Sequence, residues 1–534
     1  MRAFRLIAVL YRIGLLSPLA IARLFLAIYR RGINLMALLN FAARAYGDRI
    51  ALADASGKPS YTYRQLCEES ERLAVALRQE YGIGKGKKVG LMCKNHAAMV
   101  KTIYAVSATG ADLVLLNAEM GDSRWNALSE RQSFDLLVHD EEHAPMLRSS
   151  SYPGPALPCD HPDGPSINGL ISTGSPGRPR GSLGRSSAGK LVLLTGGTTG
   201  QPKEAAHKPS LFDYLNPFSD FLGRLRIVKY KTAYIATPIY HGYGIAVLLL
   251  VCALGKKAVI SPGFDAGQAC RLVREHRAEI VTVVPLMLRK MLLADKGGEL
   301  RSLACIASGG AELSPKLVRE TRERAGEALY NLYGTSEAGL NLIATPEDLA
   351  YSPNTIGRPI RGVRLRILDE RGKEAPAGRV GRICVRNRWS AKTGAPGWIE
   401  TGDLGYRDER GYYFLRGRTD SMIVSAGENV YPLEVEQVLL AHPLVEDAAV
   451  IGVRDEHFGQ RLKAFVEKMP AGGMADGKAA DADRPNGGLT EAELRAWLRE
   501  RLARFQMPGE IVFVDRLPYT ALGKPDKMRL AEMG

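Results

Sequence analysis

The stretch Leu191 to Lys203, L-V-L-L-T-G-G-T-T-G-Q-P-K, joins four apolar residues to a loop rich in glycine and threonine. The apolar run, residues 191–194, has the length and bounding turn residues of a buried strand, which would deliver the loop to one place. Glycines let backbone N–H groups approach an anion, threonine hydroxyls add donors, and Lys203 adds a positive charge. This composition suits a polyphosphate; a surface turn after a core strand is the alternative.

The loop differs from the phosphate-binding loop of kinases and GTPases. That motif requires G-x-x-x-x-G-K-[ST], whereas here Pro202 precedes the lysine and Glu204 follows it. No serine or threonine stands next to Lys203 to bind magnesium, so other parts of the chain must decide what the loop binds.

Length and composition indicate a globular protein with two to four domains or subdomains, because 534 residues exceed one ordinary core. A net charge of +15 fits nucleic acid, an anionic membrane or anionic substrates. No nucleic-acid-binding motif accompanies the charge, so we expect no nucleic acid partner. The seven cysteines are scattered, odd in number and lack C-x-x-C. This pattern fits a reducing cytoplasm, without structural zinc or a disulfide framework.

Residues 1–31 are apolar and basic, with six arginines and no acidic residue. Arg12 and Arg23 interrupt the apolar runs before either could span a bilayer, and Pro18 favours two short helices. We expect a peripheral anchor that lies in the plane of the inner membrane face, with its arginines at lipid phosphates. An uncleaved signal anchor and a helix pair packed on the protein's own core are the alternatives.

Helix and strand patterns alternate over residues 33–139 and resume after the glycine-rich loop, which predicts parallel strands joined by crossover helices. Polar or glycine-rich turns follow several of these strands, where open α/β sheets bind ligands. Residues 149–189, dense in Ser, Gly, Pro and Arg, are predicted to be a long surface excursion. Beyond Ile360, short strands with turns lead to a compact α+β tail.

Six motifs occur in one order: T-G-G-T-T-G-Q-P-K, S-G-G-A-E-L-S-P, Y-G-T-S-E, T-G-D-L-G, R-G-R-T-D and a late G-K. Together they resemble the adenylate-forming superfamily of acyl-CoA synthetases, luciferases and peptide-synthetase adenylation domains, from about Asn34 to Leu530. The resemblance implies two half-reactions. A carboxylate attacks the α-phosphorus of ATP to give an acyl-adenylate and pyrophosphate, and a thiol then displaces AMP. ATP, Mg²⁺ and coenzyme A are the implied cofactors and co-substrate.

The resemblance assigns nucleotide-binding roles residue by residue. The loop would close over the β- and γ-phosphates through Thr195, Gly196, Gly197, Thr198, Thr199, Gly200 and Lys203. Adenine would lie along Gly309, Gly310 and Ala311 and pack against Tyr333, which Gly334 follows; a plain β-turn and a core tyrosine are the alternative.

Further residues are assigned to the reacting groups by the same resemblance. Thr335 would donate to the α-phosphate, and Glu337 would hold magnesium, since hard cations prefer carboxylate oxygen; a T-x-E that caps a helix is the alternative. Asp403 would accept both ribose hydroxyls, with Arg418 beside it, unless the two form only a surface salt bridge. His241, after Tyr240, matches an aromatic-His pair near the acyl carboxylate.

Asp420 falls where this family hinges a small carboxyl-terminal domain. Rotation of that domain would present Lys524 for adenylation, and the turn from Ser425 to Asn429, with Gly427, for thioester formation. We therefore expect an α/β fold in three parts. A membrane-interface segment (1–32) precedes a large N-terminal domain of α/β subdomains and a β-rich subdomain (33–419), and a small mobile α+β domain (420–534) ends the chain.

The sequence departs from the family pattern in two places. Gly196 stands where many relatives have Ser, a change that also resembles fatty-acid-activating members. Tyr519 stands where Arg is common, and Pro525 follows Lys524, which makes that lysine the least secure assignment.

Three features look most like bacterial fatty-acid-CoA ligases: the basic apolar amino terminus, Gly196, and the stretch G-S-P-G-R-P-R before the phosphate loop. We expect a medium- or long-chain fatty acid to be activated and transferred to CoA. Transfer to a separate carrier protein and a nucleotide- or acyl-binding protein with impaired catalysis are the alternatives; a homodimer is left open.

Overall fold

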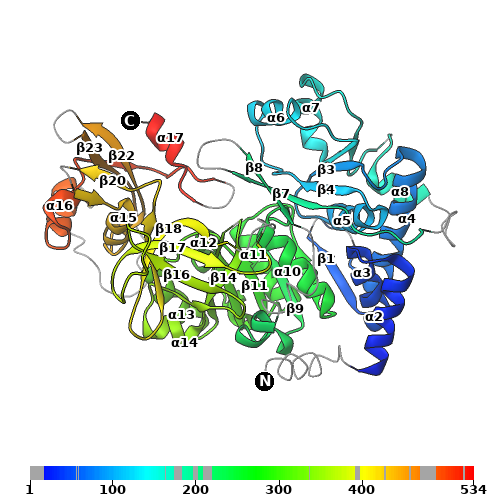
Figure 1. The fold of residues 1–534 in the computed structure, drawn as a ribbon, viewed down its shortest axis with the longest axis horizontal. Coiled ribbons are helices and arrows are strands. Elements are labelled where there is room, and N and C mark those ends of the chain that lie inside the picture. Colours follow the sequence, from blue (N-terminus) through cyan, green and yellow to red (C-terminus); the bar gives the residue numbers. More distant parts are fainter. Residues whose placement is uncertain are drawn as a thin grey trace.

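The computed structural model describes residues 17–55, 57, 59–162, 164–173, 183–196, 202–207, 219–335, 337–390, 397–425, 428–455, 459–469, 489–520 and 524–533. Two large sheets build the N-terminal part, and a separate small sheet lies in the C-terminal part, at the opposite end of the molecule from the first helices (Figure 1). The predicted α/β fold with a β-rich subdomain and a smaller α+β part is confirmed.

The first large sheet has six strands in the order β6-β5-β3-β4-β7-β8. All neighbouring pairs except β7–β8 are parallel. The predicted strand before the glycine-rich loop is β7, and it pairs with β4 inside this sheet. The strands are β3 (Lys88–Met92), β4 (Asp112–Leu115), β5 (Leu136–His139), β6 (Ala156–Pro158), β7 (Leu191–Gly196) and β8 (Pro202–His207).

The second large sheet has thirteen strands and joins an α/β half to the β-rich half. Its order is β16-β17-β18-β19-β15-β14-β13-β12-β11-β9-β10-β1-β2. The α/β half contains β1 (Ile50–Asp54), β2 (Tyr61–Thr62), β9 (Thr232–Ile235), β10 (Lys257–Ile260), β11 (Ile280–Val283), β12 (Cys305–Gly309) and β13 (Leu329–Thr335). The rest is β14 (Gly339–Ala344), β15 (Thr355–Pro359), β16 (Arg364–Leu368), β17 (Gly381–Arg386), β18 (Ile399–Arg407) and β19 (Tyr413–Arg418).

Helices α3, α4, α5 and α10 contribute to one hydrophobic cluster with residues of both large sheets. Every residue of α5 is buried, so this helix lies in the interior. The helices of the N-terminal part are α2 (Pro18–Arg31), α3 (Leu35–Tyr46), α4 (Tyr63–Tyr81), α5 (Ala97–Thr109), α6 (Asp122–Ser129), α7 (Ala144–Ser149), α8 (Ile167–Thr173), α10 (Gly242–Ala253), α11 (Ala266–His276), α12 (Pro285–Ala294), α13 (Pro315–Ala325) and α14 (Pro346–Tyr351).

The C-terminal part builds its own hydrophobic core around a three-stranded sheet, β22-β23-β24. A two-stranded ladder, β20–β21, precedes this sheet, and the proposed hinge Asp420 lies between β19 and β20. The elements are β20 (Ile423–Ser425), β21 (Glu428–Val430), α15 (Pro432–Leu440), β22 (Val445–Asp455), β23 (Gly459–Lys468), α16 (Glu491–Arg499), β24 (Glu510–Val514) and α17 (Lys527–Glu532).

The predicted surface excursion at residues 149–189 is wrong in part. Strand β6 extends the parallel sheet beside β5, and α8 packs against α4 and α5. Cys159 and Ile167 are buried there. The abundance of turn-forming residues around these short elements hid them from the sequence patterns.

Candidate active site

The predicted site residues of the α/β half lie at one edge of the thirteen-stranded sheet. Parallel strands β9, β11, β12 and β13 are consecutive neighbours. His241 follows β9, Gly309 ends β12, and Thr335 ends β13. The carboxyl ends of parallel strands meet at the same edge, so the topology gathers these residues as the sequence predicts.

The backbone on either side of the glycine-rich loop forms a two-stranded ladder. β7 and β8 are antiparallel, with Thr195 opposite Lys203 and Gly196 opposite Pro202. The loop therefore joins the ends of a β-hairpin at the edge of the six-stranded sheet. Gly197, Thr198, Thr199 and Gly200 lie outside the described residues, as does Gly427, and their phosphate and CoA roles stay predictions.

The predicted adenine segment begins where β12 ends. Gly310 has a φ of +83°, a left-handed conformation that favours glycine. Gly309 is confined by the next strand, because an added Cβ would lie 3.0 Å from the Leu332 carbonyl oxygen. Tyr243, at the start of α10, donates from its hydroxyl to the Ala307 carbonyl at 2.7 Å. This hydrogen bond fixes the start of α10 to the strand that carries the glycines.

The Y-G-T-S-E motif forms the end of β13 and the turn into β14. Among the described residues no helix follows this motif, so the alternative that the T-x-E caps a helix is wrong. The Thr335 hydroxyl instead accepts the backbone N–H of Ala338 at 3.2 Å. The hydroxyl hydrogen is not used in that bond and can be donated to a ligand. Gly334 allows the tight turn, since a Cβ there would lie 2.5 Å from the Gly339 carbonyl oxygen. Glu337 follows in the turn with a half-buried side chain.

Asp403 and Arg418 face each other across the β18–β19 ladder, which brings the two motifs side by side. Arg418 donates to Asp403 Oδ1 at 3.1 Å, and its other nitrogens donate to Asp420 at 2.9 and 3.0 Å. The Tyr333 hydroxyl donates to Asp403 Oδ2 at 2.6 Å. A carboxylate has about four acceptor positions, so Asp403 retains capacity for two ribose hydroxyls.

Burial raises the pKa of Asp403, while its bond from Tyr333 and the charges of Arg418 and Lys524 act to lower it. The Lys524 side chain keeps contact with solvent. The surrounding protein nevertheless lowers the pKa of Lys524 by desolvation; Asp403 opposes this shift and Arg418 adds to it. Lys524 of the C-terminal part thus lies within electrostatic reach of the predicted ribose pair, the arrangement that the family resemblance implies for adenylation.

The two sequence departures around Lys524 have a structural explanation. Tyr519 pairs with Pro525 in an isolated antiparallel bridge, and the Thr520 N–H donates to the Lys524 carbonyl at 2.8 Å. The segment therefore forms a small hairpin that presents Lys524. The Tyr519 hydroxyl donates to Asp447 within the C-terminal part. Asp447 in turn pairs with Arg289 of the N-terminal part, so Tyr519 supports the contact between the two parts indirectly.

His241 is the N-cap residue of α10, and its ring lies 4.6 Å from that of Tyr240. Burial lowers the pKa of His241 to about 4, so the imidazole is neutral at pH 7. Its Nε2 atom is buried and makes no hydrogen bond within the described part of the chain. An unsatisfied buried polar atom is costly, so this nitrogen is suited to a hydrogen bond with a ligand.

Three residues that sequence patterns did not identify support this site. Asn95, between β3 and α5, donates to the Thr237 carbonyl at 3.0 Å and accepts the Ile239 N–H at 2.7 Å, which fixes the segment before Tyr240. Glu312, just after Ala311, accepts from Gln437 of α15 at 2.5 Å. Arg289 of α12 forms ion pairs with residues of β22. Of these, only Glu312 belonged to a recognised motif.

Glu312 predicts a pH-dependent position of the C-terminal part. Enclosure between the two parts raises the pKa of Glu312 to about 8, against an ordinary value of about 4.3. If the C-terminal part rotates away from the N-terminal part, the Glu312 carboxyl is exposed and loses its proton. When the C-terminal part docks again, this carboxyl must take up a proton. Docking of the C-terminal part is therefore strongest at low pH. Its equilibrium constant falls by up to about tenfold per pH unit as the pH rises to about 8.

We expect the rate of acyl-adenylate formation, relative to that of Glu312→Gln, to fall between pH 6 and 8 and then level off. The amide resembles the protonated carboxyl and still accepts from Gln437. Titration of Lys524 affects both proteins alike, so the ratio of their single-turnover rates isolates Glu312. A ratio that is constant with pH would contradict this role.

Comparison with known proteins identifies the family of the chain. Residues 39–393 match the family model of the AMP-binding enzymes, and residues 434–524 match that of the AMP-binding enzyme C-terminal domain. A feruloyl-CoA synthase from Amycolatopsis is 30% identical over 491 residues, which cover 89% of this chain and 94% of the relative.

A fatty acid–[acyl-carrier-protein] ligase from Streptomyces coeruleorubidus is 30% identical over 489 residues, covering 87% of this chain and 89% of the relative. Among solved structures, the amide bond synthetase from Marinactinospora thermotolerans aligns with a TM-score of 0.74 and 26% identity over 93% of this chain and 99% of its own.

The chain belongs to the AMP-binding enzyme family. It is an adenylate-forming ligase, and ATP and Mg²⁺, with CoA for the CoA ligases of the family, are the cofactors of that class.

Proposed function

We propose that the chain activates a medium- or long-chain fatty acid as its acyl-adenylate and transfers the acyl group to CoA. The main support for a site that binds the substrate carboxylate is the Nε2 atom of His241, which is buried and has no hydrogen-bond partner among the described residues. His241 lies beside Tyr240 and at the same sheet edge as Gly309. A neutral imidazole with Nε2 protonated would donate to the substrate carboxylate without attracting the phosphates.

The residues divide the work of the first half-reaction. Asp403, held by Tyr333 and Arg418, would accept the ribose hydroxyls and fix the nucleotide. Lys524 would place its charge between the carboxylate and the α-phosphate as negative charge grows there. The Thr335 hydroxyl would donate to the α-phosphate, and Glu337 would hold magnesium beside the phosphates. Magnesium, when bound, would neutralise phosphate charge. A carboxylate oxygen such as that of Glu337 is a suitable ligand for this ion.

The test is ATP-dependent pyrophosphate release over a panel of acids from acetate through long-chain to aromatic acids, with and without CoA. We expect the highest kcat/KM with medium- or long-chain fatty acids and thioester formation that requires CoA. His241→Ala should raise the KM for the acid while the KM for ATP changes little. A maximum with aromatic acids such as ferulate would overturn the fatty acid assignment.

A second acceptor has specific support, because one of the relatives is a fatty acid–[acyl-carrier-protein] ligase. In that case the phosphopantetheine thiol of a separate carrier protein would attack the acyl-adenylate, take the acyl group as a thioester and release AMP. Acyl transfer to holo-carrier protein in place of free CoA, after normal pyrophosphate release, would favour this function.

We also propose that α2 contacts the surface of an anionic membrane. This helix packs through small residues, Ala20 and Ala27, and leaves large apolar side chains exposed; Phe25 and Tyr29 are each 71% exposed. Arg30 is exposed on the same helix. Large apolar side chains beside arginines suit a lipid interface. In the described part of the chain, no helix combines the length and hydropathy needed to cross a bilayer.

Sedimentation with vesicles tests this contact. We expect the full chain to bind vesicles of anionic phospholipid more tightly than neutral ones, and Phe25→Glu to weaken binding at least tenfold. Leu293→Glu is the matched control, because Leu293 is 53% exposed on α12. Equal binding by both variants and the parent chain would contradict the assignment.

A further inference from the structure

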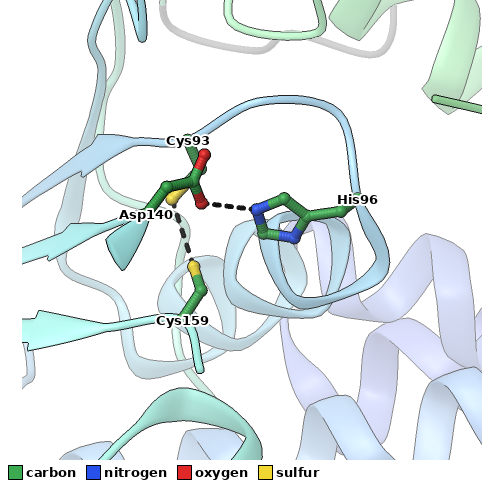
Figure 2. Close-up of side chains that lie close together, drawn as sticks. All are labelled: Cys93, His96, Asp140 and Cys159. Carbon is green, nitrogen blue, oxygen red and sulfur yellow. Dashed lines mark hydrogen bonds and ion pairs between the residues drawn. The ribbon is translucent and has the colours of Figure 1, made fainter. Parts of the chain in front are cut away.

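Four side chains with metal-binding chemistry meet at the carboxyl end of the six-stranded sheet, and none of them is among the residues assigned to catalysis. Cys93 follows β3, His96 begins α5, Asp140 follows β5, and Cys159 follows β6 (Figure 2). Strands β6, β5 and β3 are adjacent and parallel, which brings these residues together from distant parts of the sequence. One ligand atom from each residue lies within 4.8 Å of the others.

The geometry within the cluster is close to that of a four-ligand site. The two sulfur atoms are 3.2 Å apart, and His96 Nε2 lies 2.6 Å from Asp140 Oδ1. Two thiolates on one tetrahedral zinc are about 3.8 Å apart, given Zn–S bonds of about 2.3 Å. Moving the sulfur atoms apart by about half an ångström would thus make room for an ion. The second carboxylate oxygen already accepts the Lys94 N–H at 2.8 Å, which orients Asp140 as outer partners orient metal ligands.

We propose that Cys93, His96, Asp140 and Cys159 form a structural binding site for Zn²⁺. Two sulfurs, one imidazole and one carboxylate match the ligand types of this ion, and Cys93 and Cys159 are buried. The spacing of the cysteines in the sequence gave no sign of such a site, because three separate strands supply the ligands.

Proton balance sets one requirement on binding. His96 Nδ1 accepts the Met99 N–H at 3.2 Å, so Nε2 carries the ring proton and donates to Asp140. Zinc would release one proton from each thiol, and the imidazole proton would move from Nε2 to Nδ1. The helix-capping hydrogen bond to His96 Nδ1 and the hydrogen bond between His96 and Asp140 are thereby lost while four metal–ligand bonds form.

The zinc site would also stabilise the segment before Tyr240 and His241, where we propose that the acid substrate binds. The turn between Cys93 and His96 contains Asn95, whose side chain is hydrogen-bonded to residues 237 and 239, just before Tyr240. An ion held by Cys93 and His96 would fix this turn from both sides.

The test is zinc stoichiometry of the full chain under reducing conditions, after loading with Zn²⁺ and dialysis, by elemental mass spectrometry. We expect one zinc per chain and a higher Tm with zinc, and at least a tenfold lower affinity in Cys93→Ser, Cys159→Ser and His96→Asn. Asparagine still caps a helix, so His96→Asn separates ligand loss from misfolding. Cys384→Ala, a buried cysteine of β17, is the matched control and should bind zinc normally.

Cobalt provides a spectroscopic check, because thiolate-to-cobalt charge-transfer absorption should appear in the parent chain and be lost in both serine variants. Zinc retained equally by all variants, or by none of the proteins, would overturn the site. A Cys93–Cys159 disulfide whose reduced form binds no zinc would likewise overturn it and assign the pair to thiol–disulfide chemistry.

Discussion

Lys524→Ala is expected to slow acyl-adenylate formation by about 10²–10³-fold, the usual effect of removing one preorganised group that stabilises transition-state charge. Thioester formation from supplied acyl-adenylate and CoA should be nearly unchanged. The reason is geometric: the small hairpin around Tyr519 and Pro525 presents Lys524 within electrostatic reach of Asp403 and Arg418. In this arrangement we expect the cation to serve the adenylation half-reaction.

Single-turnover pyrophosphate release measures the first half-reaction, and thioester formation from synthetic acyl-adenylate measures the second. Lys527→Ala is the matched control, since Lys527 pairs with Glu436 at 3.1 Å inside the C-terminal part. It should leave the ratio of the two half-reactions unaltered. Equal loss of both half-reactions in Lys524→Ala would refute a role restricted to adenylation.

Sequence patterns predicted most of the parallel core because its strands are short apolar runs followed by turn residues. Strand β3 (Lys88–Met92) is one of these runs, within the predicted alternation over residues 33–139. Helix α10 was not predicted because it is apolar on nearly all sides, which leaves no helical period to detect. In the predicted α+β tail, helix α16 begins at Glu491 and ends at Arg499, and a short 3-10 turn follows at Arg504–Gln506.

Motifs located the site residues but gave little of their bonding. Asp403 and Arg418 were assigned together, and the ladder between β18 and β19 shows why they meet. The hydrogen bond from Tyr333 to Asp403 was not foreseen, since Tyr333 was expected only to pack against adenine. Asn95 acts through hydrogen bonds to backbone atoms of a distant segment. Such contacts depend on tertiary packing, which local patterns do not encode.

Arg289→Ala is expected to slow adenylation by roughly 100-fold through the position of the C-terminal part. Arg289 of α12 lies 3.3 Å from a Glu446 oxygen and 3.2 Å from Asp447 Oδ2, and it donates to the Glu446 carbonyl at 2.6 Å. Alanine would leave both carboxylates enclosed without their cation. Breaking a buried ion pair costs about 3–5 kcal/mol. Because these side chains keep some solvent contact, we expect the substitution to make the free energy of docking about 3 kcal/mol less favourable.

Thioester formation from supplied acyl-adenylate should be unchanged or faster in Arg289→Ala, because it does not require this docked arrangement. Tyr519→Phe removes only one hydrogen bond to Asp447 and should slow adenylation about fivefold, equivalent to about 1 kcal/mol. Arg322→Ala is the control, since Arg322 pairs with Glu327 at 2.7 Å on the exposed surface of the N-terminal part. Parallel loss of both half-reactions would contradict a docking role.

The double variant Arg289→Ala/Lys524→Ala decides how the docking contact works. If Arg289 acts only by placing Lys524, removing it from a chain that already lacks Lys524 should slow adenylation little further. If the two losses multiply, docking must position other groups as well. Glu312 is the first candidate, because it is a further carboxylate enclosed at this interface and contacts Gln437 of the C-terminal part directly. Adding Glu312→Gln to the double variant would then test whether that contact accounts for the remaining loss.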